Sequence, residues 1–211
     1  MASDQSGRLR RLLWAALVLG VLTVSATAYA HASAKPAVLH GDAVWQAGAK
    51  PAPDLALRDQ DGRLVTMASL RGHQVLLTFL DSQCTQDCPI EGHELATLGH
   101  QLGRSARPVL LVVSVNPTDR PATARAFIHQ SGLDTGWTWY WLMGTKAQLA
   151  PVWKSYNITV IPQNGDIAHS TVLYLIDAKG QQRAGYLFPF PLGAVTTDVR
   201  ALAAENRGWV W

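Results

Sequence analysis

Cys84 and Cys88 are the only cysteines of the 211-residue chain, and they stand four positions apart, with Pro89 directly after the second. Two thiols at this spacing can exchange with another disulfide, close into a disulfide of their own, or bind a soft metal ion together. A disulfide that encloses so short a loop restrains the unfolded chain very little, so a purely structural crosslink would stabilise the fold poorly. We therefore interpret the pair as functional rather than structural.

The pair is expected to lie between a strand and a helix. Residues 75–80 are a continuous apolar run of strand length, typical of a strand buried on both faces. Apolar residues then recur at helical spacing over residues 90–102. A helix N-terminus carries a partial positive charge, so we expect it to favour the thiolate form of both cysteines. The spacing of four predicts that both sulfur atoms share one face of the first helical turns.

A selective metal site needs a third ligand beside the two thiolates, and sulfur combined with imidazole suits Cu(I), Cu(II) or Zn(II). The chain has seven histidines, of which His93 and His100 are expected to be solvated on the helix after the cysteines. His169 differs, because it lies in a loop that leads into a predicted core strand at residues 171–176. Such loops lie near one end of the sheet, and Cys84 is expected at the same end because it follows the strand 75–80. Spacing alone leaves His169 either a structural histidine or a ligand.

Strands and helices alternate along the rest of the chain. Further strands are predicted at residues 55–57, 64–66, 109–115, 137–141 and 185–187, and further helices at 121–129, 146–156 and 192–204. This order predicts βαβ units and a mostly parallel sheet, with one antiparallel strand at the end, and hence a single α/β domain. With 48% hydrophobic and 16% charged residues the chain is too apolar for a disordered protein. It shows no basic patch of the kind that nucleic-acid binding requires, so no nucleic-acid partner is expected.

The N-terminus predicts where the protein works. Residues 12–30 are uncharged and mostly apolar, and Arg8, Arg10 and Arg11 precede them. The stretch is either a cleaved signal peptide that ends at Ala28-Tyr-Ala30 or an uncleaved membrane anchor. Both interpretations place residues 31–211 outside the cytoplasm, on the periplasmic or cell-surface side. We accordingly predict a signal peptide or anchor at residues 1–30, a linker at 31–50 and one domain at 51–211.

From about residue 51 to residue 206 the chain resembles the Sco/SenC family of copper-binding thioredoxin-fold proteins, which help to assemble cytochrome c oxidase. The matching motifs are Leu77-Thr-Phe-Leu80 before Cys84-x3-Cys88-Pro89, Trp141-Leu-Met-Gly-Thr145, Tyr156-Asn-Ile-Thr, and His169-Ser170 leading into Tyr174-Leu-Ile-Asp-Ala-Lys-Gly180. The resemblance implies a thioredoxin-like fold, with a central mixed sheet flanked by helices.

The same resemblance implies a metallochaperone rather than an enzyme. Copper, as Cu(I) or Cu(II), would be held by Cys84, Cys88 and His169, and the partner would be a copper-accepting oxidase subunit. The chain departs from the family pattern where Thr85 replaces a proline and where Ala168 replaces an aspartate before the histidine. A thiol–disulfide exchange partner remains the alternative, because a cysteine pair at a helix tip can exchange with the thiols of another protein.

Overall fold

The computed structural model describes residues 13–20, 36–103, 107–163 and 166–207. Most of the predicted signal peptide or anchor therefore lies outside the described residues. Residues 13–20 form a helix whose side chains are exposed. Among the described residues, no helix is both long enough and apolar enough to cross a membrane.

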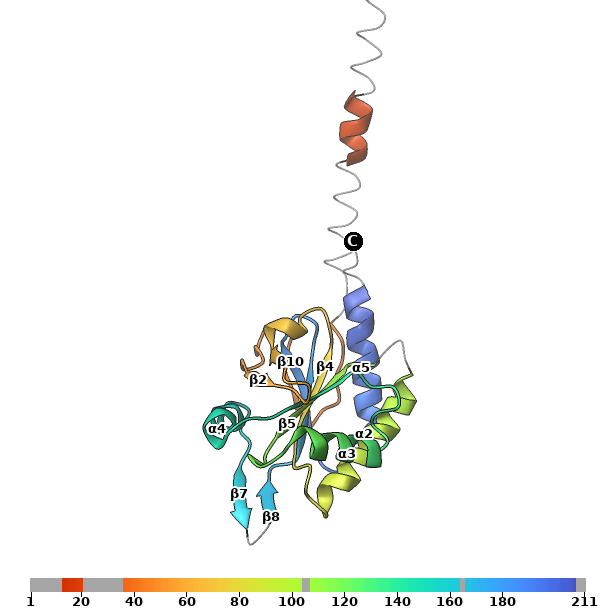
Figure 1. The fold of residues 1–211 in the computed structure, drawn as a ribbon. Coiled ribbons are helices and arrows are strands. Elements are labelled where there is room, and N and C mark those ends of the chain that lie inside the picture. The colour runs from red at the N-terminus through yellow and green to blue at the C-terminus, as the bar shows by residue number, and fades with distance from the viewer. Residues whose placement is uncertain (1–12, 21–35, 104–106, 164–165, 208–211) are drawn as a thin grey trace, which may run out of the picture. The chain divides into compact units, whose positions relative to one another are not determined.

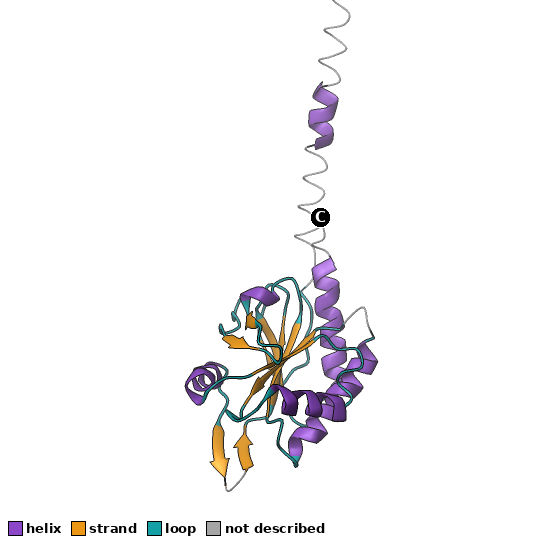
Figure 2. Cartoon of the chain, in the orientation of Figure 1, coloured by secondary structure: helices purple, strands orange, loops and turns teal. Residues whose placement is uncertain are grey.

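A six-stranded mixed sheet forms the centre of the domain (Figures 1 and 2). In spatial order the strands are β1 (Ala43–Val44), β10 (Gln182–Leu187), β9 (Val172–Ile176), β4 (Val75–Leu80), β5 (Val109–Ser114) and β6 (Trp139–Leu142). Strands β4, β5 and β6 run parallel, whereas β1 and β10, β10 and β9, and β9 and β4 pair antiparallel. The sheet confirms the predicted α/β, thioredoxin-like fold class with a mixed sheet. The expectation of a mostly parallel sheet with one antiparallel strand is wrong, because three of the five strand pairs are antiparallel.

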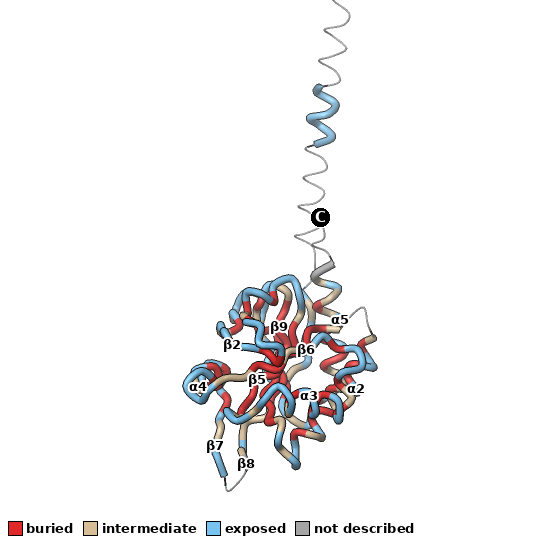
Figure 3. The backbone as a smooth tube through the Cα atoms, in the orientation of Figure 1, coloured by how far each residue is buried: buried red, intermediate tan, exposed pale blue. Residues whose placement is uncertain are grey.

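Every residue of β4 and β5 is buried, because both faces of the sheet are covered (Figure 3). Side chains of a strand alternate between its faces. Leu77 and Phe79 accordingly enter one apolar cluster, and Leu76 and Leu80 enter the other. The continuous apolar run at 75–80 is thus the signature of a strand that lies between two cores.

Helices cover the two faces unequally. The helices α2 (Asp87–Leu102), α3 (Pro121–Gln130) and α5 (Leu192–Arg207) pack on the face of Leu76 and Leu80, and α4 (Lys146–Ser155) packs on the other face. Figure 1 shows α4 apart from the three other helices. A short 3-10 helix, η1 (Ala68–Leu70), precedes β4. Helix α2 begins three residues before the predicted start at residue 90, which brings Cys88 into its first turn.

Two hairpins flank the central sheet. The first pairs β2 (Ala56–Arg58) with β3 (Leu64–Thr66), as the sequence predicts. The second pairs β7 (Val160–Gln163) with β8 (Asp166–His169), where a loop is predicted, and it projects from the domain in Figure 1. Residues 43–44, within the range predicted as linker, pair with β10 as strand β1.

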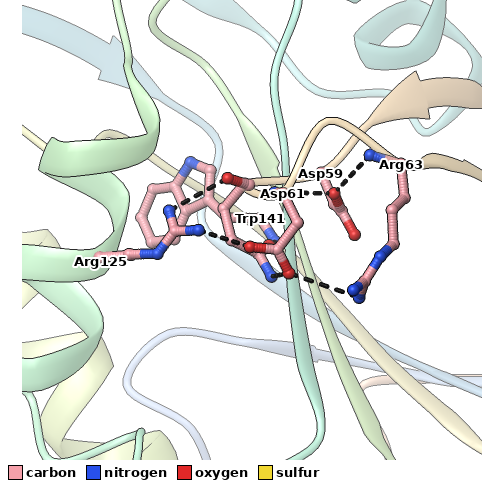
Figure 4. Close-up of polar contacts among 6 residues, drawn as sticks. Asp59, Asp61, Arg63, Arg125 and Trp141 are labelled. Carbon is pink, nitrogen blue, oxygen red and sulfur yellow. Dashed lines mark hydrogen bonds and ion pairs between the residues drawn. The ribbon is translucent and has the colours of Figure 1, made fainter.

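Polar contacts fix the turn of the first hairpin to the rest of the domain (Figure 4). The Asp59 carboxylate accepts hydrogen bonds from the backbone N–H groups of Asp61 and Arg63, each at 2.9 Å, which closes the turn. Arg125 of α3 forms an ion pair with Asp61. The backbone N–H of Trp141 donates to the side-chain oxygen of Gln60 at 2.9 Å, so the turn is also bound to β6.

Candidate metal centre

Cys84 lies in the loop that joins β4 to α2. The backbone N–H of Cys84 donates to the Asp81 carbonyl at 3.3 Å, and that of Gln83 donates to the Asp81 carboxylate at 2.8 Å. The prediction that both cysteines share a helix face is therefore wrong for Cys84, because the helix begins only at Asp87. Cys84 remains half-buried, while Cys88 is buried in the first turn of α2.

Burial decides the protonation of Cys88. Desolvation raises the pKa of the Cys88 thiol well above its ordinary value, and a hydrogen bond with Cys84 and the nearby charge of Glu91 act in the same direction. A hydrogen bond from the backbone of Asp81 only partly opposes this shift. The prediction that the helix N-terminus favours the thiolate is thus wrong for Cys88 in the metal-free protein. A metal ion that binds there must displace a proton.

His169 ends β8 and faces Cys88. Its Nε2 lies 3.6 Å from the Cys88 sulfur, and its Nδ1 lies 3.1 Å from the backbone oxygen of Ser170. A carbonyl oxygen can only accept, so this contact assigns the ring proton to Nδ1 and the lone pair to Nε2. The backbone thus orients the ring on its Nδ1 side, in a chain that has Ala168 where the family has an aspartate.

The spacing of Cys88 and His169 fits a shared metal ion. Bonds of about 2.3 Å to sulfur and about 2.0 Å to nitrogen, at an angle of roughly 110°, would separate the two ligand atoms by about 3.5 Å, close to the 3.6 Å between Cys88 Sγ and His169 Nε2. A thiolate with an imidazole is a soft donor set that suits copper or zinc. Within the described residues, however, no three Cys, His, Asp or Glu side chains stand together as a complete metal site.

Glu91 lies on α2 three residues after Cys88 and was not predicted to belong to the site. It is only 1% exposed, and its Oε1 lies 2.6 Å from the Thr78 hydroxyl, which also lies 3.0 Å from the Val172 carbonyl oxygen. The hydroxyl has one proton but faces two acceptors, so both contacts are hydrogen bonds only when Glu91 is protonated and donates to Thr78. Burial raises the pKa of Glu91 to about 8, against the opposing effect of the contact with Thr78, so the carboxyl group is mostly protonated at neutral pH.

A sequence signal for Glu91 does exist. Leu95, Leu98 and Leu102 follow it at spacings of four, three and four, so Glu91 occupies the first position of the apolar face of α2. A carboxylate at such a position is either paired or protonated when it is buried.

Comparisons with known proteins agree with the fold. A family model described as SCO1/SenC matches residues 46–204. The bovine (Bos taurus) protein named "Protein SCO2 homolog, mitochondrial" is 31% identical over 165 residues, which cover 73% of this chain. The match spans 60% of the length of the bovine protein.

Two solved structures illustrate the similarity of fold. ScoI of Bradyrhizobium japonicum, solved with copper bound, is 26% identical and has a TM-score of 0.60, over 71% of this chain and 98% of that one. BsSco is 21% identical, with a TM-score of 0.61, over 73% and 94% of the two chains, and therefore supports the fold alone. BsSco is described as a member of the Sco family of cytochrome c oxidase assembly proteins, and a disulfide switch was identified in BsSco itself.

Proposed function

Because the chain belongs to the SCO1/SenC family, we propose that it is an extracytoplasmic copper-binding chaperone that delivers copper to a subunit of a respiratory oxidase. The proposed copper ligands are Cys84, Cys88 and His169. The copper-bound structure of the related ScoI supports the choice of metal. Membership of the SCO1/SenC family supports the choice of client, because the Sco family is described as one of cytochrome c oxidase assembly proteins. The apolar stretch at residues 12–30, behind three arginines, supports the extracytoplasmic placement.

One observation carries the proposal: the Nε2 lone pair of His169 faces the Cys88 sulfur at 3.6 Å, close to the separation of about 3.5 Å expected for two ligands of one ion. Copper is the cargo here, so the site must both hold it and release it. Cys88 is buried and Cys84 is half-buried on a loop, so Cys84 is the thiolate that a client's ligand reaches first. Transfer would begin by exchange at Cys84, while Cys88 and His169 still hold the ion.

Copper titration of the reduced full-length protein tests this proposal. Wild type should bind one copper ion, and Cys84→Ser/Cys88→Ser should bind none with comparable affinity. His169→Ala should weaken Cu(II) more than Cu(I), because two thiolates can still hold Cu(I). His100→Ala is the matched control, since His100 lies exposed on α2, away from the first turn, and its loss should leave the affinity unchanged. If the double serine variant binds copper as tightly as wild type, the site lies elsewhere.

A second function, thiol–disulfide exchange, is favoured by the unequal burial of the two free thiols. The half-buried Cys84 thiolate would attack a client disulfide, which forms a mixed disulfide and releases one client thiol. Cys88 would then attack the Cys84 sulfur, release the second client thiol and leave a Cys84–Cys88 disulfide. Cys88→Ser should trap the mixed disulfide with a copper-free oxidase subunit. Negligible copper binding together with such trapping would favour this function over copper delivery.

A further inference from the structure

Asp119 joins the cysteine loop to the body of the domain. It lies in the loop between β5 and α3, and its carboxylate is within hydrogen-bond distance of five donor groups. These are Ser82 Oγ at 2.5 Å, the Ser82 backbone N–H at 3.3 Å, Gln83 Nε2 at 3.4 Å, Ser114 Oγ at 2.7 Å and Trp141 Nε1 at 3.3 Å. Three of the five donors belong to the two residues that directly precede Cys84.

The other two donors fix Asp119 itself. Ser114 is the last residue of β5 and is fully buried, and Trp141 is fully buried in β6. The Trp141 ring packs edge-on against Phe127 of α3 at 5.2 Å between centroids, and its backbone is bound to the first hairpin (Figure 4). Asp119 is therefore anchored in rigid elements on one side and holds a loop on the other.

The three candidate ligands differ in what holds them. Cys88 is fixed by the first turn of α2 and by burial, and His169 by the pairing of β8 with β7. Cys84 belongs to no helix or strand, so the position of its sulfur depends on the contacts of its loop. Within those contacts, the carboxylate of Asp119 accepts from both residues before Cys84, and the nearby Asn116 amide reaches the loop through Asp81 at 3.0 Å.

We propose that Asp119 is a positioning residue, which sets where the Cys84 sulfur stands relative to Cys88 and His169. The inference rests on the proposed function for its effect on copper, but it also applies to the metal-free thiols. Asp119→Asn keeps the size of the side chain. It leaves a single acceptor oxygen for the five donor groups that now share the two carboxylate oxygens. Loss of a group that orients a ligand typically weakens metal binding by about 10- to 100-fold.

A double-mutant cycle tests whether Asp119 acts through Cys84. The affinity of the full-length protein for Cu(II) is measured for wild type, Asp119→Asn, Cys84→Ser and the double variant. We expect Asp119→Asn to weaken binding about tenfold or more in wild type, and to change it less than about twofold once Cys84 is absent. The sulfur-to-Cu(II) absorption band of Asp119→Asn should shift toward that of Cys84→Ser. Equal losses in both backgrounds would overturn the inference.

The metal-free protein supplies an independent readout. Glutathione disulfide oxidises Cys84 and Cys88 to their disulfide and is itself reduced to two glutathione thiols. The hydrogen bonds of Asp119 stabilise the position that Cys84 has in the reduced protein. Asp119→Asn should therefore raise the equilibrium constant for disulfide formation by about threefold or more. If wild type binds no copper but this equilibrium shifts, the proposed function fails while the positioning role stands. If wild type binds copper and neither quantity changes, the positioning role fails.

Two further variants serve as a control and as a substitute for Asp119→Asn. Asp198→Asn is the matched control, because Asp198 is a fully buried carboxylate on α5 that accepts bonds from His40 and Tyr186, away from the cysteine loop. It should lower stability without changing copper affinity by more than about twofold. Should Asp119→Asn not fold, Ser82→Ala removes the 2.5 Å contact from the loop side and keeps the carboxylate. It should weaken copper in wild type by about threefold and have no effect without Cys84; an effect that persists without Cys84 overturns the inference.

Discussion

Replacing Glu91 by glutamine should remove a large part of the pH dependence of stability. The folded protein holds Glu91 with a pKa of about 8, because the side chain is buried, while the ordinary value is 4.5. Between these two pH values the folded state keeps a proton that the unfolded state has released. This contribution to stability is thus fully present below about pH 4.5 and is lost as the pH rises through about 8.

The size of the effect follows from the two pKa values. Where only the unfolded state is ionised, the free energy of unfolding falls by about 1.4 kcal/mol per pH unit. Integration from pH 5 to pH 7 gives a loss of about 2.5 kcal/mol from Glu91 alone. The glutamine side chain of E91Q would stay neutral at every pH and can donate from its amide to Thr78, which would keep its own bond to Val172.

Urea unfolding of the reduced, metal-free protein at pH 5, 6, 7 and 8 measures this quantity. The stability difference between E91Q and wild type should rise with pH in favour of E91Q. The variant E94Q is the control, because Glu94 lies on the same helix, is only half-buried and accepts the backbone N–H of Phe190 at 3.0 Å. E94Q should keep most of the pH dependence of wild type, because burial is the largest cause of the raised Glu91 pKa and the charge of Glu94 is a smaller one. Parallel curves for E91Q and wild type would refute a protonated, buried Glu91.

Three further predictions concern the core, a buried network and the metal. Phe79→Ala should lower the free energy of unfolding by about 3–5 kcal/mol in urea, because Phe79 is fully buried and its ring centroid lies 5.7 Å from that of Tyr156. A decrease below about 1 kcal/mol would contradict this packing. Tyr186→Phe should cost about 1–3 kcal/mol by the same measurement, since the hydroxyl donates at 2.7 Å to the buried Asp198 carboxylate, and an unchanged midpoint would argue against this bond. Copper affinity, titrated from pH 9 to pH 6, should fall as the pH falls, because burial raises the pKa of Cys88 and copper must displace its proton; a constant affinity would exclude Cys88 as a ligand.

The core elements could be predicted from the sequence because their patterns are local. The apolar run at 75–80 matches β4, and the predicted helix at 146–156 matches α4 to within one residue. The hairpin that ends at His169 was missed, because neither Val160–Gln163 nor Asp166–His169 alternates between apolar and polar residues over the length of a typical strand.

The candidate site residues could be named from the sequence, but their electrostatic surroundings could not. The spacing of Cys84 and Cys88 indicates their chemistry, yet spacing does not report that Cys88 is only 2% exposed, and this burial reverses the expected effect of the helix N-terminus. Asp119 could not be predicted, because its contact with Ser82 joins residues 37 positions apart. Such contacts depend on how the sheet brings two loops together rather than on any motif.

The pairing of β7 with β8 determines which kinds of genetic change the histidine can tolerate. His169 pairs with Val160, and the backbone oxygen of Ser170 lies 3.1 Å from its Nδ1. Substitutions at Ala168 or along the hairpin can therefore accumulate without removing the group that orients the ring. A one-residue insertion or deletion in β8 would instead turn the histidine to the opposite face of the hairpin. A change of length within β8 should therefore harm the site more than a change of sequence along the hairpin.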